Sequence, residues 1–547
     1  MKNIPKSQSN FGKTTMAFTL SLVIALGWLN GACAQDLPLH GLDQAKDQES
    51  GKDKDIVSTD DLSGGDALNP DRILLEKPSL KALITIDQKV DPFLLDAGGN
   101  TQMNLDDVLN SALNNNLDIS IADSNVLAKK YTLLSSSGKF LPDITLSYRY
   151  NYLKGKANVP FGSTAEPLRF NNPFILTSAG FKYYGYRGGS VVFTALQNRN
   201  NYRAASHARR ATISDTLQQA ARLYYDLVLQ EAILQIRIKA VQTSISQLQL
   251  NKDLKQGGMA TNLEVLQAET QLSQDRQNLI EQQVARREAS IKLAEFLNIA
   301  QDVDIAPSDR LLRRTRTVSD EALAPRLLQL AIDNRPELKQ YEELRLAAKK
   351  QIVINAAKLQ PTFQFNGSVL GIGETLSKSY ELVPITLAGV TAGTGGTALR
   401  NRQITALYTL GVNFNWNFEG LGTVDLANTY AAKADARQAI LKQSQELNKV
   451  ISEVRRAYIN ALKTDRKIDE TVSQVRSANE ELRLAQLRFQ NGVGKNIDVL
   501  KAQQDYTTAL IEKARAIVSF NQAQVDLLHN TGLISLGTLT AKVPPVK

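Results

Sequence analysis

The chain has 547 residues, with 64 Lys and Arg against 55 Asp and Glu, three His and a single Cys. One cysteine excludes a disulfide framework and the zinc sites that need several Cys ligands. The histidines lie far apart in the sequence, and no Ser/His/Asp, Cys/His or paired-carboxylate constellation can be defended. The sequence therefore predicts no enzyme, no metal and no other cofactor. The net charge of +9 is modest and forms no basic stripe, which argues against nucleic acid as a partner.

The N-terminus has the pattern of a secretory signal peptide. Three lysines precede an apolar run over 16–28 that is too short to span a membrane, and Ala32-Cys33-Ala34 follows as a small-residue cleavage site. Residues 1–34 are therefore expected to be removed. In the alternative, Cys33 becomes a lipid-bearing first residue, although Asn30 stands where that motif needs an apolar side chain. Both readings predict export.

Residues 35–100 are rich in Asp, Lys, Ser and Gly. Apolar side chains are too few there to offset the entropy lost on ordering. We expect this segment to be a mostly disordered N-terminal arm.

An internal duplication organises the rest of the chain. Three residues of the first copy recur at a constant spacing in the second: Asn115, Lys139 and Pro142 correspond to Asn334, Lys358 and Pro361. Further on, the segment 258–266 recurs as 492–500. We expect two structural repeats over 101–306 and 323–532, a linker at 307–322 and a C-terminal tail at 533–547.

Apolar and polar residues alternate in three segments, which is typical of a half-buried strand, and a fourth strand is expected in the first repeat although Gly185, Gly188 and Gly189 blur its pattern. These strands are expected at about 142–153, 179–194, 361–371 and 404–418. The clearest apolar face belongs to the last strand and consists of Tyr408, Leu410, Val412, Phe414 and Trp416. In the first strand, Tyr148, Tyr150 and Tyr152 either form part of an interfacial aromatic belt or pack across strands.

Long stretches without Gly or Pro predict a long helix after each strand pair. A helix of ~55–60 residues would extend for roughly 80–90 Å. Each helix stops at a glycine turn, Gly257-Gly258 or Gly492-Val493-Gly494, and a returning helix follows. Helical hairpins are therefore expected at about 196–299 and 423–531. An alanine every seventh residue from Ala502 to Ala523 predicts a narrow seam for close helix packing.

The strands constrain the assembly. Four strands cannot close a barrel alone, because the smallest spanning barrels have about eight. An open edge in lipid leaves backbone groups unpaired at a cost of several kcal/mol each. If the apolar face of 404–418 contacts lipid, other copies must complete the sheet, and three copies would supply twelve strands. A soluble β-sandwich is the alternative, disfavoured because helices surround each short strand pair.

This order resembles the TolC-type outer-membrane efflux proteins over nearly all of 101–532. The resemblance rests on the duplicated order of two helices, two strands, a long helix and a returning helix. Local marks are AIDNRPEL at 331–338, NLEVLQA at 262–268 and IDVLKA at 497–502. It implies an α+β membrane protein that forms a homotrimer, with a twelve-stranded outer-membrane β-barrel and a periplasmic α-helical barrel.

The resemblance also implies a function and partners. The expected function is a passive exit channel of a tripartite efflux or type I secretion system, which docks to a periplasmic adaptor (membrane fusion) protein and an inner-membrane pump. A periplasmic coiled-coil structural or adhesion protein without a pore is the alternative.

The tips of the helical hairpins are the sites that the resemblance implies. Adaptor contact is expected at Gly257, Gly258, Asn262, Gly492, Gly494 and Lys495, where plain reversal of the helix is the competing role. The channel entrance is expected at Glu264, Asp498 and Lys501. The family often carries two acidic residues three positions apart here. Asp498 matches the first, but Lys501 holds the second position, so we expect Asp498 to pair with Lys501 of its own or a neighbouring chain.

Overall fold

The computed structural model describes residues 72–74, 100–157, 168–300, 302–309, 311–318, 324–376, 379–384 and 397–540. The predicted signal segment, including Cys33, lies outside these residues, as does most of the polar arm.

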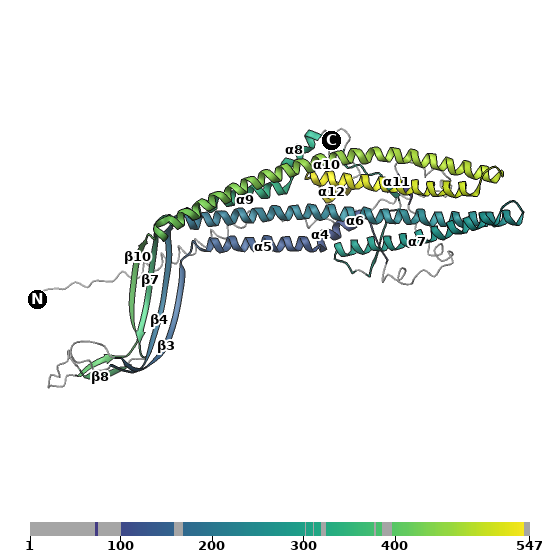
Figure 1. Cartoon of the computed structure of the whole chain (residues 1–547). Helices are drawn as coiled ribbons and strands as arrows, with labels where there is room; N and C mark the ends of the chain where they lie inside the picture. Colours follow the sequence, from purple (N-terminus) through teal and green to yellow (C-terminus); the bar gives the residue numbers. More distant parts are fainter. Residues whose placement is uncertain are drawn as a thin grey trace, which may run out of the picture. The chain divides into compact units, whose positions relative to one another are not determined.

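Four long strands form one antiparallel sheet in the order β10-β7-β4-β3 (Figure 1). Their bounds are Asp143–Ala157 for β3, Leu168–Arg187 for β4, Thr362–Gly373 for β7 and Thr405–Asn415 for β10. The two repeats meet in the middle of the sheet, where β4 pairs with β7. In the described sheet β3 and β10 are edges, each paired on one side only.

The predicted bounds of the second strand, 179–194, are wrong. Strand β4 starts earlier and ends at Arg187, because Gly188 and Gly189 adopt positive φ angles of +60° and +78° and helix α6 begins at Ser190. A Cβ on Gly188 would lie 2.2 Å from the carbonyl oxygen of Ala357, so no side chain fits there.

The predicted strand 404–418 is also too long. Strand β10 ends at Asn415, so Trp416 lies beyond the sheet. Its indole Nε1–H donates to the Leu359 carbonyl at 3.1 Å. Because this bond holds the ring beside the chain that enters β7, Trp416 does not continue the alternation of the strand.

Two helical hairpins follow the strand pairs. Hairpin 1 consists of α6 (Ser190–Gln256, 67 residues) and α7 (Asn262–Phe296, 35 residues). Hairpin 2 consists of α10 (Thr423–Gln490, 68 residues) and α11 (Asn496–Asn530, 35 residues). The longest helices extend for about 100 Å at 1.5 Å per residue. The hairpins lie side by side, with α11 packed on α6 (Figure 1), and the predicted alanine seam of α11 is buried.

Shorter helices brace the long ones. They are α4 (Leu105–Asn115), α5 (Leu117–Gly138), α8 (Ala324–Asn334) and α9 (Pro336–Ala356). Asn116 caps α5, since its Oδ1 accepts from the Asp118 N–H at 2.9 Å, and Pro336 occupies the first turn of α9. Helix α9 packs against both α6 and α10, whereas α5 packs against α6 and has no comparable contact with α10 among the described elements.

Parts of the predicted arm, linker and tail contribute to the packed structure, although most of the arm lies outside the described residues. Arg72–Leu74 (β1) pairs with Leu311–Arg313 (β6), and Asn100–Met103 (β2) pairs with Asp304–Pro307 (β5). Leu536–Thr540 (α12) packs on α4 and buries Leu539. A further hairpin, Tyr380–Pro384 (β8) with Thr397–Asn401 (β9), lies between β7 and β10 in sequence.

The main apolar core lies where the short helices meet the long ones. It includes Leu109, Leu227, Leu293 and Phe520, all fully buried. The Tyr224 hydroxyl donates to Asp309 at 2.6 Å, and burial raises the pKa of Tyr224 far above its ordinary value.

Among the described residues, none of the helices has the length and apolar character needed to cross a membrane.

Candidate functional site

The turn of hairpin 1 depends on a glycine in the left-handed conformation. Gly257 caps α6, and Gly258 has φ +74°, which a side chain resists. The Met259 N–H closes the turn by donating to the Leu254 carbonyl at 2.8 Å. A Cβ on Gly258 would meet nothing within 4 Å, so the requirement for glycine comes from the backbone alone.

Helix α7 begins with a capping box. Thr261 Oγ1 accepts from the Glu264 N–H at 3.4 Å, and Glu264 Oε2 accepts from the Thr261 N–H at 2.6 Å. The carboxylate of Glu264, predicted to line the channel entrance, is therefore engaged in its own helix cap. Asn262 is exposed, and its Oδ1 accepts from Lys255 Nζ at 2.8 Å.

The turn of hairpin 2 depends on two glycines. Gly492 has φ +74°, and the Gly494 N–H donates to the Arg488 carbonyl at 2.9 Å. A Cβ on Gly494 would lie 2.9 Å from the Phe489 nitrogen, so a side chain there forces the backbone to move. Lys495 is exposed and precedes α11 without a side-chain cap.

Asp498 and Lys501 are both exposed and line one hollow of about 770 Å³ on hairpin 2. The remaining lining residues are Arg476, Ser477, Glu480, Glu481, Leu484, Ala485, Arg488 and Gly494. Within the described part of one chain, no ion pair joins Asp498 to Lys501. A pairing between neighbouring chains stays a prediction.

Asn496 is the tip residue that sequence reasoning missed. It is 1% exposed and lies between the hairpins. Its Oδ1 accepts from Gln247 Nε2 at 3.2 Å and from Asn251 Nδ2 at 3.0 Å, and its Nδ2 donates to the Glu264 carbonyl at 3.2 Å. The duplicated segment aligns Asn496 with Asn262. That signal marked both residues without indicating which of them is buried.

The sheet carries a continuous apolar face. The cross-strand register brings together Phe414 with Phe363, Val412 with Phe365, Leu410 with Gly367 and Tyr408 with Val369. On the next strands Phe181 faces Ile144 and Ile175 faces Tyr150. These side chains are mostly exposed in the single chain, with Leu410 at 85% and Ile144 at 74%. The opposite face carries polar pairs such as Ser147 with Ser178 and Ser368 with Thr409.

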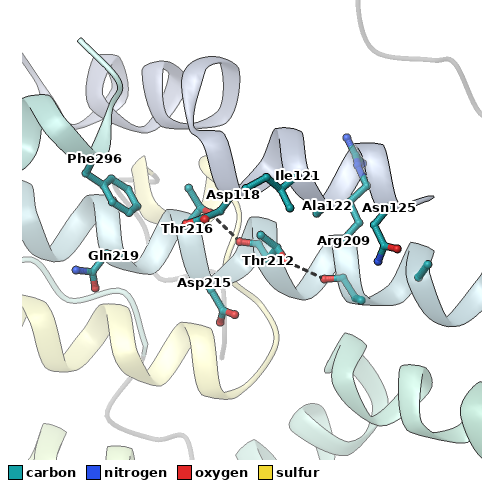
Figure 2. Close-up of a pocket in the computed structure, with 12 residues that line it drawn as sticks. Asp118, Ile121, Ala122, Asn125, Arg209, Thr212, Asp215, Thr216, Gln219 and Phe296 are labelled. Carbon is teal, nitrogen blue, oxygen red and sulfur yellow. Dashed lines mark hydrogen bonds between the residues drawn. The ribbon is translucent and has the colours of Figure 1, made fainter. Parts of the chain in front are cut away.

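A second hollow, of about 550 Å³, lies between α5 and α6. Figure 2 shows Asp118, Ile121 and Asn125 of α5 on one side and Thr212 of α6 on the other. Ile121 is 66% exposed. The hollow therefore belongs to an unpartnered face of α5.

One side-chain group has the composition of a metal site. Single ligand atoms of Asp215, Glu337 and His529 lie within 4.8 Å of one another. His529 Nε2 is hydrogen-bonded to Asp215 at 2.7 Å, and Glu337 is paired with Arg335 at 3.1 Å. The first contact joins α11 to α6, and the second holds Glu337 at the start of α9, so both side chains already have protein partners.

The sequence matches a known protein family over both repeats. The family model described as "Outer membrane efflux protein" matches residues 108–298 and 327–533, which coincide with the two copies of the duplication. The chain belongs to the outer membrane efflux protein family. It is accordingly a transport protein of the outer membrane with a large periplasmic helical part, and not an enzyme.

Solved structures share its fold. The outer-membrane channel OprN is 18% identical, with a TM-score of 0.64, and the match covers 84% of this chain and 93% of that one. CusC is 16% identical, with a TM-score of 0.65 and coverage of 79% and 92%. The CmeC outer membrane channel of Campylobacter jejuni is 16% identical, with a TM-score of 0.64 and coverage of 78% and 85%. A comparison with curated protein sequences found no match.

Proposed function

We propose that three copies of this efflux protein close a twelve-stranded barrel in the outer membrane, and that their hairpins form a water-filled periplasmic tunnel. The observation that carries the proposal is the apolar face of the four-stranded sheet, together with its two unpaired edges β3 and β10. Backbone groups at an open edge cannot remain unpaired in lipid. Pairing β10 of one copy with β3 of the next would satisfy both edges and turn the apolar face toward acyl chains.

The brace helices support the same assembly. Because the repeats are duplicates, α5 and α9 occupy corresponding places, yet α9 packs against two long helices and α5 against one. The exposed face of α5 carries apolar side chains, including Leu117, Ile121 and Tyr131. A neighbouring copy would supply its α10 to this face, just as α6 of the first repeat covers α9 of the second repeat in the same chain.

The tips provide the docking end of the channel. Met259 and Val493 are 76% and 73% exposed at the two turns, next to the glycines that reverse the hairpins. Apolar side chains held on rigid turns suit recognition by a periplasmic adaptor, which would connect the channel to an energised inner-membrane pump. In this arrangement Asp498 and Lys501 lie near the entrance, and the channel itself is passive.

The test is the behaviour of the mature protein during extraction. The proposal expects it in the outer-membrane fraction, released only by detergent, with a mass in light scattering of three times that of one chain after correction for detergent. A monomer released without detergent would contradict the proposal and favour a periplasmic coiled-coil protein without a pore.

A further inference from the structure

The contact between the two hairpins of one chain is a polar seat for Asn496. Gln247 and Asn251 of α6 donate to its amide oxygen, and the Glu264 carbonyl accepts from its amide nitrogen. Seven residues further along the same face of α11, Gln503 Nε2 donates to Ser244 Oγ at 3.0 Å. Ser244 Oγ in turn donates to Asp275 at 2.5 Å. A chain of buried hydrogen bonds therefore joins α6, α7 and α11 near the tips.

The duplication places a corresponding surface on hairpin 2, although its residues differ. The residues that correspond to Gln247, Asn251 and Glu264 are Glu481, Ala485 and Asp498. These three line the 770 Å³ hollow. We call Glu481, Ala485 and Asp498 the open seat.

The residues that would fill the open seat lie exposed on α7. Asn496, Leu500, Gln503 and Thr507 of α11 are buried, whereas their counterparts Asn262, Leu266, Glu269 and Ser273 of α7 are exposed. Leu500 is 4% exposed and Leu266 is 51% exposed. Within the described chain α7 makes no contact with α10 comparable to that of α11 with α6. One chain therefore presents both halves of an unmade contact.

We propose that the open seat receives Asn262 from α7 of a second copy. The ring of hairpins then has two kinds of seam, α11 on α6 within a chain and α7 on α10 between copies, and the seam between copies is the less strongly bonded. The inference rests on the proposed assembly, because it needs a second copy beside the first. Beyond that assembly, it identifies the residues that meet between copies and the seam that separates more readily.

The chemistry of the two seams differs in kind. Lys255 already donates to Asn262 Oδ1, which leaves the amide N–H groups of Asn262 as donors. Glu481 offers only acceptors, so the pair is complementary, and Lys255 brings a positive charge toward Glu481. The seat inside the chain instead offers amide donors to the amide oxygen of Asn496.

The seam between copies has fewer polar partners. Ala485 replaces Asn251, and Ala478 and Ala509 replace Ser244 and Asp275, so the buried chain of hydrogen bonds has no counterpart there. Each such bond adds to the stability of a seam when both partners are satisfied. The two hairpins of one chain should therefore remain joined when adjacent copies part at the tip.

Paired cysteines test the contact, because the mature chain has no cysteine once the segment carrying Cys33 is removed. The variant N262C/A485C is treated with a short, reducible bis-methanethiosulfonate reagent, and the matched control N251C/N496C is treated in the same way. The first should give covalently linked dimers and trimers on a non-reducing denaturing gel. The control should keep the mobility of a single chain.

The outcomes separate this inference from the proposed assembly. If light scattering shows trimers but N262C/A485C gives only single chains, the seat assignment is wrong and the trimer stands. If the protein is monomeric, both fail.

The relative strength of the seams is tested by conductance in planar bilayers. Linking N262C/A485C should hold the channel in its low-conductance state and reduction should reverse this, whereas linking N251C/N496C should change conductance little. An equal block from both pairs would overturn the claim that copies part at the Asn262 seam.

Discussion

A lysine placed on the apolar face of β10 gives the sharpest test of the membrane assignment. Leu410 lies at the centre of the strand Thr405–Asn415, faces Gly367 across the sheet and is 85% exposed in the single chain. If that face contacts lipid, Leu410→Lys should destabilise the barrel by ~2–4 kcal/mol per chain. Three copies of the substitution would triple that cost in each assembled barrel.

Neighbouring positions convert this into a graded series. Val412 lies two residues further along the strand, ~7 Å from Leu410 at ~3.3 Å per residue. If Leu410 lies at the midplane of the bilayer and the strand is tilted by about 45°, Val412 is ~5 Å from that midplane. Because the cost falls toward the interface, Val412→Lys should cost about 2 kcal/mol. Asn413 lies on the opposite face, beside Gln364, where lysine should be tolerated.

The assay is the urea midpoint of the purified protein in lipid vesicles, together with the trimer fraction on unheated denaturing gels. A loss of about 2 kcal/mol per chain corresponds to a roughly 30-fold change in the folding equilibrium. The expected order of stability is N413K, then V412K, then L410K. If L410K and N413K were tolerated equally, water would contact both faces of the sheet and the barrel would be wrong.

Three further predictions concern the helices. Gly494→Ala should disturb the tip more than Gly258→Ala, because only the Cβ at position 494 would lie 2.9 Å from a backbone atom. Hydrogen exchange of the turn amides measures the difference, and equal protection of the two turns in their respective variants would contradict this prediction. Asp498→Ala should change single-channel conductance and ion selectivity, and unchanged values would remove Asp498 from the entrance. Burial raises the pKa of Tyr225 to about 12, so its contribution to stability is complete below pH 10, the ordinary pKa, and is lost as the pH rises toward 12. Thermal unfolding of Tyr225→Phe should be less sensitive to pH in that range, and an identical pH dependence would count against this.

The sequence predicted the elements well wherever the pattern was local. Alternation of apolar and polar residues located β3, β7 and β10, and the absence of Gly and Pro located the long helices. The end of β4 was misplaced, because Gly188 ends the strand for a reason that is not local. Its backbone approaches Ala357, a residue of the other repeat.

At the tips, too, the sequence indicated the turns but not the contacts of single residues. The duplication marked Asn262 and Asn496 as equivalent, but it could not distinguish the exposed residue from the buried one. The entrance role of Glu264 stays a prediction, and the structure adds that its carboxylate completes a helix cap with Thr261 at the start of α7.

The sequence by itself determined the periodicities, the turns and the duplication, because each arises from the conformational preferences of neighbouring residues. The tertiary structure decided which copy of each duplicated surface is covered. Helix α11 buries Asn496 on α6, whereas Asn262 and the open seat remain uncovered. A chain with only two repeats packs its two hairpins against each other once, through α11 and α6. The equivalent surfaces on α7 and α10 therefore stay uncovered within the described chain, one on each outer side of the hairpin pair.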